Sequence, residues 1–212
     1  MTPLGLIQAG FFYKSLSDPI VTILTAPNPP TQPDFVSQAR NSGSAYITGV
    51  EFSFQQHFTY LPGLLSGLGV LANYSYTTSQ ASNVNPARTD KPALLRQAPN
   101  TWNISPTYDR GRLSTRVGLA YNGPNIFTYA FKDGVPGGVK GPFGDQYLYS
   151  HFQIDAQGSY YLGKGFTAIA SGLNLNNEVF GFYLGSPQYV FQREYYKPTY
   201  TFGFRWQLSR EK

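Results

Sequence analysis

The sequence predicts an all-β fold in which about eight long antiparallel strands meander through part of a transmembrane β-barrel. Three observations support this fold class. Apolar and polar residues alternate with a period of two through six separate segments, as in strands with two different faces. The 17 Tyr, 16 Phe and 2 Trp of the 212-residue chain outnumber its 16 basic and 11 acidic residues combined. Short turns also alternate with long loops along the chain.

The composition excludes several other classes of protein. Charged residues make up 13% of the chain and aromatic residues 17%, whereas disordered chains are highly charged and contain few aromatics. No run of 18 apolar residues occurs, so no transmembrane helix is expected. The absence of cysteine removes disulfides, thiolate metal sites and cysteine nucleophiles. The net charge of +5 is dispersed, so we expect no nucleic-acid partner.

The expected strands follow one another along the whole chain. The first is expected to bend near residues 15–19. Several exceed the 9–11 residues that cross a bilayer, so they should project beyond it. The expected ranges are 3–25, 35–59, 66–80, 97–109, 112–123, 147–162, 165–176 and 195–209.

Six of these strands separate an apolar face from a polar one. In the last strand, Phe202, Phe204 and Trp206 lie on one face. Thr201 and Gly203 lie on the other. In chain order, the apolar faces of the other five are Tyr46, Val50, Phe52 and Phe54; Leu68, Val70, Ala72, Tyr74 and Tyr76; Trp102, Ile104 and Tyr108; Leu113, Val117, Leu119 and Tyr121; and Phe152, Ile154, Ala156, Gly158, Tyr160 and Leu162.

The connections between strands alternate in length. Outer-membrane barrels have short periplasmic turns and long extracellular loops, whereas soluble antiparallel sandwiches show no such asymmetry. Short turns are expected at 61–67, 109–111 and 163–165, and long loops at about 26–34, 79–96, 123–146 and 177–195.

The chemistry of the two faces favours a membrane barrel over a soluble β-protein. The six apolar faces carry no charged residue. The polar faces are rich in Ser, Thr, Asn, Gln and Gly, and a water-facing sheet would carry more Lys and Glu. We therefore expect the apolar faces to contact lipid and the polar faces to line a partly hydrated interior. The few charges on the polar faces are Glu51, Arg116, Asp155 and Arg205.

The last strand matches the terminal signal by which the barrel assembly machinery recognises outer-membrane proteins. An exposed edge strand with bulky apolar anchors suits pairing with a receiving sheet edge, although an ordinary amphipathic strand is the alternative. Because residues 209–212 follow it, we expect weaker recognition than for a signal at the chain end. The signal residues are Thr201, Gly203, Trp206 and Leu208.

Several motifs, in sequence order, resemble TonB-dependent receptors. Segments 3–21 and 173–179 resemble two strands of that family, the second through Asn174, Leu175 and Asn176. The order and spacing are similar to the C-terminal third of a receptor barrel. Within 41–79 the matching residues are Asn41, Gly49-Val50-Glu51, Leu65-Ser66-Gly67-Leu68 and Tyr74-Ser75-Tyr76.

This resemblance implies a function and a set of partners. Such receptors are 22-stranded plugged barrels that import a scarce ligand, such as a ferric siderophore, cobalamin or a carbohydrate, with energy transmitted by TonB. It implies that residues 1–212 are the C-terminal portion of the barrel, with the plug domain, TonB box and signal peptide absent. The implied partners are the outer-membrane bilayer, the barrel assembly machinery, TonB through the missing plug, and an extracellular small-molecule or oligosaccharide ligand. A self-contained small barrel with a structural or adhesive role is the alternative.

Candidate ligand contacts lie in two of the long loops. Aromatic and basic side chains suit a siderophore or a sugar, and packing between loops is the alternative for each residue. The sequence indicates no enzyme, cofactor or metal site, because His57 and His151 have no carboxylate at metal-binding spacing. The candidates are Tyr129, Phe131, Lys132, Tyr183, Tyr189, Arg193 and Tyr195.

Overall fold

A computed structural model describes residues 5–25, 36–84, 88, 90–129 and 144–208 of the chain. Its regular elements are strands, with one short 3-10 helix, η1 (Gly63–Gly67). The all-β prediction is therefore confirmed. No helix in the described ranges is long and apolar enough to cross a membrane.

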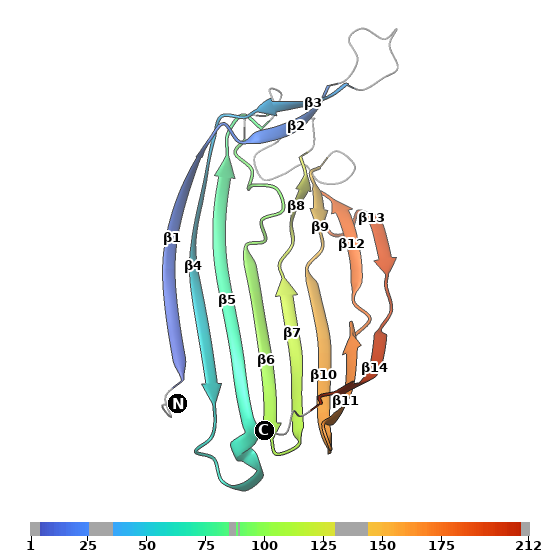
Figure 1. Cartoon of the computed structure of the whole chain (residues 1–212). Coiled ribbons are helices and arrows are strands. Elements are labelled where there is room, and N and C mark those ends of the chain that lie inside the picture. The colour runs from blue at the N-terminus through green and yellow to red at the C-terminus, as the bar shows by residue number, and fades with distance from the viewer. Residues whose placement is uncertain (1–4, 26–35, 85–87, 89, 130–143, 209–212) are drawn as a thin grey trace.

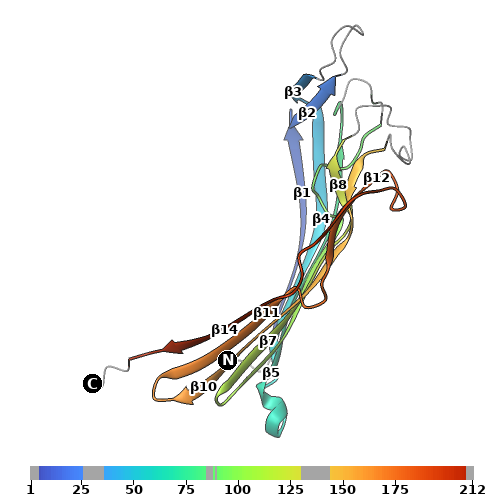
Figure 2. The same ribbon diagram turned by 90° about the vertical axis from the view of Figure 1, so that its right-hand side faces the viewer.

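Eight long strands form one antiparallel sheet, in the order β1-β4-β5-β6-β7-β10-β11-β14 (Figure 1). The predicted number of long strands and their meander are confirmed. Within the described part of the chain the outer edges of β1 and β14 pair with no strand, so the sheet is open. Figure 2 shows that the sheet is curved rather than flat. The strands are β1 (Leu6–Ser17), β4 (Ser44–His57), β5 (Leu68–Ala81), β6 (Asn100–Arg110), β7 (Leu113–Asn122), β10 (His151–Gly163), β11 (Phe166–Leu173) and β14 (Thr199–Trp206).

The register of the sheet collects the apolar residues on one face, as the alternation predicts. Cross-strand partners in an antiparallel sheet lie on the same face. Trp102 stacks on Tyr121 with ring centroids 5.6 Å apart and lies 5.7 Å from Phe152. One row of partners across six strands runs Ala9, Phe52, Tyr74, Trp102, Tyr121 and Phe152. The row beside it on the other face runs Gly10, Glu51, Ser75, Thr101, Asn122 and His151.

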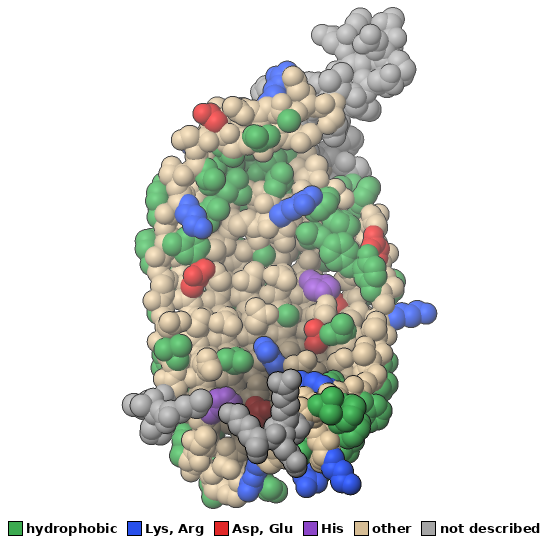
Figure 3. Space-filling model, in the orientation of Figure 1, with side chains coloured by type: hydrophobic (Ala, Val, Ile, Leu, Met, Phe, Trp, Pro, Cys, Tyr) green, Lys and Arg blue, Asp and Glu red, His purple; other side chains and the backbone are tan. Residues whose placement is uncertain are grey.

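Many large apolar side chains of this face are exposed. Phe11, Phe202 and Phe204 are 75%, 78% and 78% exposed. The opposite face, seen in Figure 3, consists mainly of uncharged polar side chains and backbone with scattered charges. A soluble sheet would bury its aromatic residues, whereas a membrane barrel turns them to lipid.

The two ends of the sheet differ as expected. The short connections, η1 and the turns before Leu113 and Phe166, lie together at the end that we call the turn end (Figure 1). The opposite end, the loop end, carries more strand than the sequence predicts. The expectation of loops throughout 123–146 and 177–195 was wrong for the parts that the structure describes, whereas loop 26–34 lies outside the described residues.

Shorter strands extend the long ones at the loop end. Strands β2 (Ile20–Thr25) and β3 (Val36–Asn41) pair above β1 and β4. The expected bend in the first strand falls at Asp18, which has a φ of 50°, and Pro19. A four-stranded sheet in the order β13-β12-β9-β8, called the upper sheet, continues β14, β11, β10 and β7. Its strands are β8 (Asn125–Thr128), β9 (Gln146–Leu148), β12 (Val179–Leu184) and β13 (Val190–Tyr195).

Between β11 and β12, side-chain hydrogen bonds to β10 supplement the main-chain bond from the Leu175 amide to the Ile154 carbonyl at 2.7 Å. The Nδ2 of Asn176 donates to the carbonyl of Phe152 at 2.5 Å, and its Oδ1 accepts from the amide of Ile154 at 3.0 Å. The carboxylate of Glu178 accepts from the amide of Phe152 at 3.0 Å. Asn174 has a φ of 55° and accepts from the Glu178 amide at 2.7 Å. The motif at 173–179 thus anchors β10 while the chain changes direction.

Candidate ligand-contact surface at the loop end

One face of the upper sheet carries a tyrosine cluster. Tyr147 and Tyr183 are cross-strand partners, with ring centroids 5.1 Å apart and planes 8° from parallel. Tyr149 lies 4.7 Å from Tyr183, and the guanidinium of Arg193 lies 5.5 Å from the centre of the Tyr149 ring. Burial, with the neighbouring tyrosines, raises the pKa of Tyr183 to about 12. The cluster is thus a packed aromatic surface with one cation on it.

The opposite face of the upper sheet carries a phenylalanine cluster. Phe182 follows directly before Tyr183 in β12, so the two side chains point to opposite faces. Phe182 lies 4.8 Å from Phe127 and 5.2 Å from Phe180. The guanidinium of Arg96 lies 4.6 Å from the Phe127 ring. Both faces of this sheet therefore combine aromatic rings with an arginine.

A buried ion-pair cluster joins the segment after β5 to β9. Arg88 contacts Asp90 at 2.6 Å and Asp145 at 2.5 Å, and its side chain is 3% exposed. Burial favours the neutral form of Arg88, but the hydrogen bonds to the two carboxylates outweigh it and raise the Arg88 pKa. The hydrogen bond from Arg88 lowers the pKa of Asp90 against the opposing effect of burial. The cluster holds fixed charges at the loop end.

A groove of about 430 Å³ lies between the end of β5, segment 90–99 and the upper sheet. Its wall combines hydroxyl, amide, carboxylate and aromatic groups, the mixture found in sites for polar small molecules. The Oδ1 of Asn125 is buried in this wall and has no hydrogen-bond partner among the described residues. A buried acceptor without a partner is unusual in a folded protein. The residues that supply the groups named above are Thr77, Ser79, Asp90, Gln97, Asn125, Asp145 and Tyr147.

The structure separates the residues that the sequence proposes as ligand contacts. Tyr183 and Arg193 share the tyrosine cluster. Tyr129 instead packs against the small core of Ala45, Ala81 and Val84, and its hydroxyl donates to the carbonyl of residue 93 at 2.8 Å. The remaining candidates are Tyr189 and Tyr195, which are 40% and 60% exposed outside the cluster, and Phe131 and Lys132, which lie outside the described residues.

Sequence reasoning missed Arg88, Asp145, Tyr147, Tyr149 and Asn125. The spacing Tyr147-x-Tyr149 is a strand signal at the edge of a glycine-rich segment. The pairing of Arg88 with Asp145 spans 57 positions and has no local signal. No group of three His, Asp or Glu suitable for a metal occurs in the part of the chain that the structure describes.

The residues of the expected assembly signal lie along β14 and just beyond it. Thr201 and Gly203 pair with Ser171 and Ile169 on the polar face. Trp206 stacks on Phe166 at 5.4 Å, and Leu208, beyond the strand end, is 78% exposed. The apolar anchors are thus presented on the outside of the sheet.

The chain is similar to known proteins in sequence and in fold. The family model described as TonB dependent receptor-like, beta-barrel matches residues 2–177. The fold is similar to that of the closed form of the ferric-catecholate import receptor Fiu from K12 E. coli, with a TM-score of 0.59 and 14% identity over 95% of this chain and 25% of that one. It is also similar to the siderophore receptor PirA from Acinetobacter baumannii, with a TM-score of 0.56 and 14% identity over 97% of this chain and 30% of that one.

The chain spans between a quarter and a third of the length of these two receptors. No curated protein matches the sequence. The family match nevertheless covers most of the chain. The chain belongs to the TonB-dependent receptor-like β-barrel family, whose members are transport receptors of the outer membrane.

Proposed function

We propose that residues 1–212 form the C-terminal portion of the barrel of an outer-membrane active-transport receptor. The receptor takes up a scarce ligand, such as a ferric siderophore, cobalamin or a carbohydrate, and is energised through TonB. Its plug domain, TonB box and signal peptide belong to other parts of the full receptor. The observation that carries the proposal is the eight-stranded register, which places an apolar coat on one face and a polar wall on the other.

The open edges of the sheet favour a part of a larger barrel over a self-contained small one. In hydrocarbon every main-chain N–H and C=O must be paired. The outer edges of β1 and β14 have no strand partner in the described ranges, although β1 alone is 12 residues long. Further strands along both edges would satisfy these groups.

The polar face suits the inner wall of a receptor. Arg116 donates to the Oγ of Ser105 at 3.0 Å. Asp155 accepts from the side chain of Gln153 and from the main chain of Asn174, both at 2.8 Å. Charges held by neighbours among many small polar groups give a hydrated surface along which a polar ligand moves without meeting an apolar barrier.

Ligand contact is proposed at the loop end, on the groove and the tyrosine cluster. Tyr147 belongs to both, so it connects the aromatic surface to the polar wall that holds Asn125. Arg193 extends this surface beside Tyr149, while Tyr183, only 6% exposed, supports Tyr147 and Tyr149 by packing against both rings. Planar aromatic groups and sugar rings both stack on tyrosine, while the unpaired Asn125 oxygen and the carboxylates recognise donors.

The orientation can be tested by labelling in the full-length receptor. The chain has no cysteine, so Tyr189→Cys and Lys164→Cys introduce unique thiols into it at opposite ends. A membrane-impermeant maleimide is expected to label Tyr189→Cys on intact cells. It should label Lys164→Cys only after the outer membrane is permeabilised, and the reverse pattern contradicts the proposal.

Transport is tested by uptake of radiolabelled ligands from the three classes in cells with and without TonB. Tyr147→Ala and Asn125→Leu are expected to weaken uptake of the same ligand about tenfold, because each removes a contact worth about 1–1.5 kcal/mol. Tyr195→Ala, an exposed site outside the groove, is the control. Uptake that is independent of TonB, or equal in all three variants and the wild type, contradicts the proposal.

A further inference from the structure

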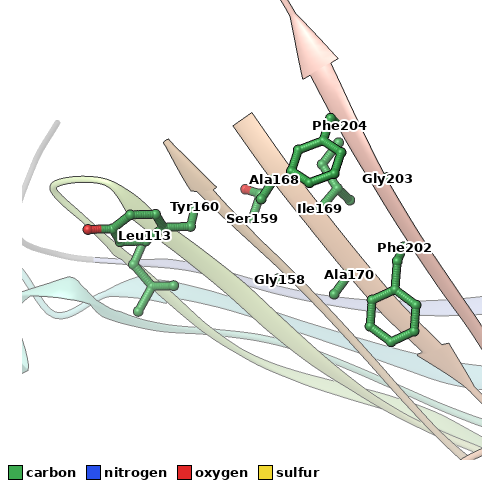
Figure 4. Close-up of a pocket in the computed structure, with 10 residues that line it drawn as sticks. All are labelled: Leu113, Gly158, Ser159, Tyr160, Ala168, Ile169, Ala170, Phe202, Gly203 and Phe204. Carbon is green, nitrogen blue, oxygen red and sulfur yellow. The ribbon is translucent and has the colours of Figure 1, made fainter. Parts of the chain in front are cut away.

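A groove runs along β10 and β11 on the apolar face, near the turn end (Figure 4). Its floor consists of the small residues Gly158, Ala168 and Ala170. Phe202 and Phe204 on β14 form one side, and Leu113 and Tyr160 form the other. A hollow of about 330 Å³ continues into a second of about 380 Å³, and the two share Gly158, Ala170 and Phe202.

The backbone conformation does not require small side chains at the floor of the groove. Gly158 lies in an ordinary strand, and an added Cβ would meet only the Cγ2 of Thr115 at 3.4 Å and the carbonyl of Ser114 at 3.8 Å. A larger side chain is therefore compatible with the fold at this position. The strands that form the groove are mutual neighbours, so its shape does not depend on the strand that pairs with the outer edge of β14.

The stacked rings of Phe166 and Trp206 border the groove on the same face toward the turn end. Leu175 and Tyr200 close it toward the loop end, since a Cβ on Gly172 would lie 2.7 Å from Leu175 and 3.3 Å from Tyr200. From Tyr160 to Ala156 the groove extends four residues along β10, which is about 14 Å. This length is close to that of one leaflet of the hydrocarbon core, about 15 Å.

Basic residues lie in and beside the two turns at this end of the sheet. Arg110 is the cross-strand partner of Leu113 and so lies on the apolar face. The carbonyl of Arg112 accepts from the amide of Tyr161 at 2.8 Å, which places this turn beside the next one, where Lys164 lies. Figure 3 shows Lys and Arg side chains gathered at this lower end of the molecule. The nearby carboxylate of Asp109 pairs with Ser114 on the other face.

We propose that this groove binds one acyl chain of an anionic phospholipid of the periplasmic leaflet, whose phosphate is held by the basic turns. The apolar channel matches the chain in character and in length. The cations lie where a head group of that leaflet would be, because short turns of outer-membrane barrels are periplasmic. Lys and Arg beside a membrane surface attract anionic lipids.

Native mass spectrometry of the full-length receptor, extracted from outer membranes in a mild detergent, tests the acyl site. The wild type is expected to retain one phosphatidylglycerol. Gly158→Leu combined with Ala170→Phe fills the groove and should reduce retention at least tenfold. Ala72→Phe, on the same apolar face but outside the groove, should leave retention unchanged. Each variant is shown to be folded if it resists unfolding by detergent in an unheated sample and unfolds in a heated one.

The basic turns are tested separately, so a folding failure of the filled variant does not end the test. Arg112→Gln with Lys164→Gln should weaken retention of phosphatidylglycerol about tenfold and leave phosphatidylcholine unchanged, whereas Arg40→Gln at the loop end should change neither. Equal retention by the wild type and the filled variant would overturn the proposal. The proposal would also be overturned if the filled variant lost a bound second receptor copy, or bound lipopolysaccharide, and kept its phospholipid. None of these readouts involves transport, so they stand apart from the test of the proposed function.

Discussion

Replacing Arg88 with methionine is expected to open the loop end locally without unfolding the main sheet. Methionine keeps much of the apolar volume but removes the guanidinium group that contacts Asp90 and Asp145. Breaking a buried ion pair by removing one partner costs about 3 kcal/mol, since a charge stays uncompensated. The local opening equilibrium should therefore rise by about two orders of magnitude.

Amide hydrogen exchange measured by mass spectrometry detects this opening. The amides of Leu94 and Arg96 report on it, because they donate to the Oγ of Ser79 and the carbonyl of Ile126 across the affected segment. Arg40→Met is the matched control. Arg40 is exposed, and its Nε donates to the Oε1 of nearby Gln38 at 2.8 Å, so its replacement should change stability by less than about 0.5 kcal/mol.

The pH dependence provides a second check of the same reasoning. The hydrogen bond from Arg88 lowers the pKa of Asp90, so its stabilising effect is present above the ordinary carboxyl pKa. It is lost as the pH falls through the lowered pKa. The difference between wild type and Arg88→Met should thus narrow below about pH 4. Unchanged exchange of Leu94 and Arg96 at pH 7, or a difference that does not narrow in acid, would refute the reasoning.

Three further predictions concern other parts of the molecule. Asn176→Ala should lower the free energy of unfolding in urea by about 2 kcal/mol by leaving main-chain groups of β10 unpaired, whereas Gln157→Ala should change it by less than about 0.5 kcal/mol. Gly165→Ala should cost about 2 kcal/mol in the same assay, since its φ is 82° and the new Cβ would lie 2.2 Å from a carbonyl oxygen, and Gly10→Ala, with nothing within 4 Å, should cost much less. The pKa of Tyr183 is about 12 in the folded protein and about 10 in the unfolded chain, so its contribution to stability is present below pH 10 and lost toward pH 12. In a pH titration followed by tyrosinate absorbance, Tyr183→Phe should remove one tyrosine that ionises near pH 12.

The faces of the main sheet could be predicted from sequence because the period of two is a local property. Phe202 and Phe204 alternate with Thr201 and Gly203 wherever the strand is placed, and the register then aligns those faces. The upper sheet was not predictable in the same way. Its strand β9 has only three residues, too few to show a period, and it pairs with β12 from a distant part of the chain.

The candidate site depends still more on long-range pairing. Tyr183 and Arg193 were identified from side-chain chemistry, and both lie in the tyrosine cluster. Tyr129 has the same chemistry, but the structure packs it against the small core at the top of β4 and β5. Side-chain chemistry does not reveal burial: Tyr183 is only 6% exposed because it packs against Tyr147 and Tyr149, and Tyr129 packs against the small core.

The motif at 173–179 connects the membrane sheet to the ligand-contact surface. Below it, β10 and β11 pair in antiparallel register from Ala156 and Gly172 onward, and such a ladder pairs the main-chain groups as hydrocarbon requires. Above it, Asn176 and Glu178 pair the main chain of β10 through their side chains. The main-chain ladder can end at this level because its groups remain paired, and the upper sheet is then free to take its own direction.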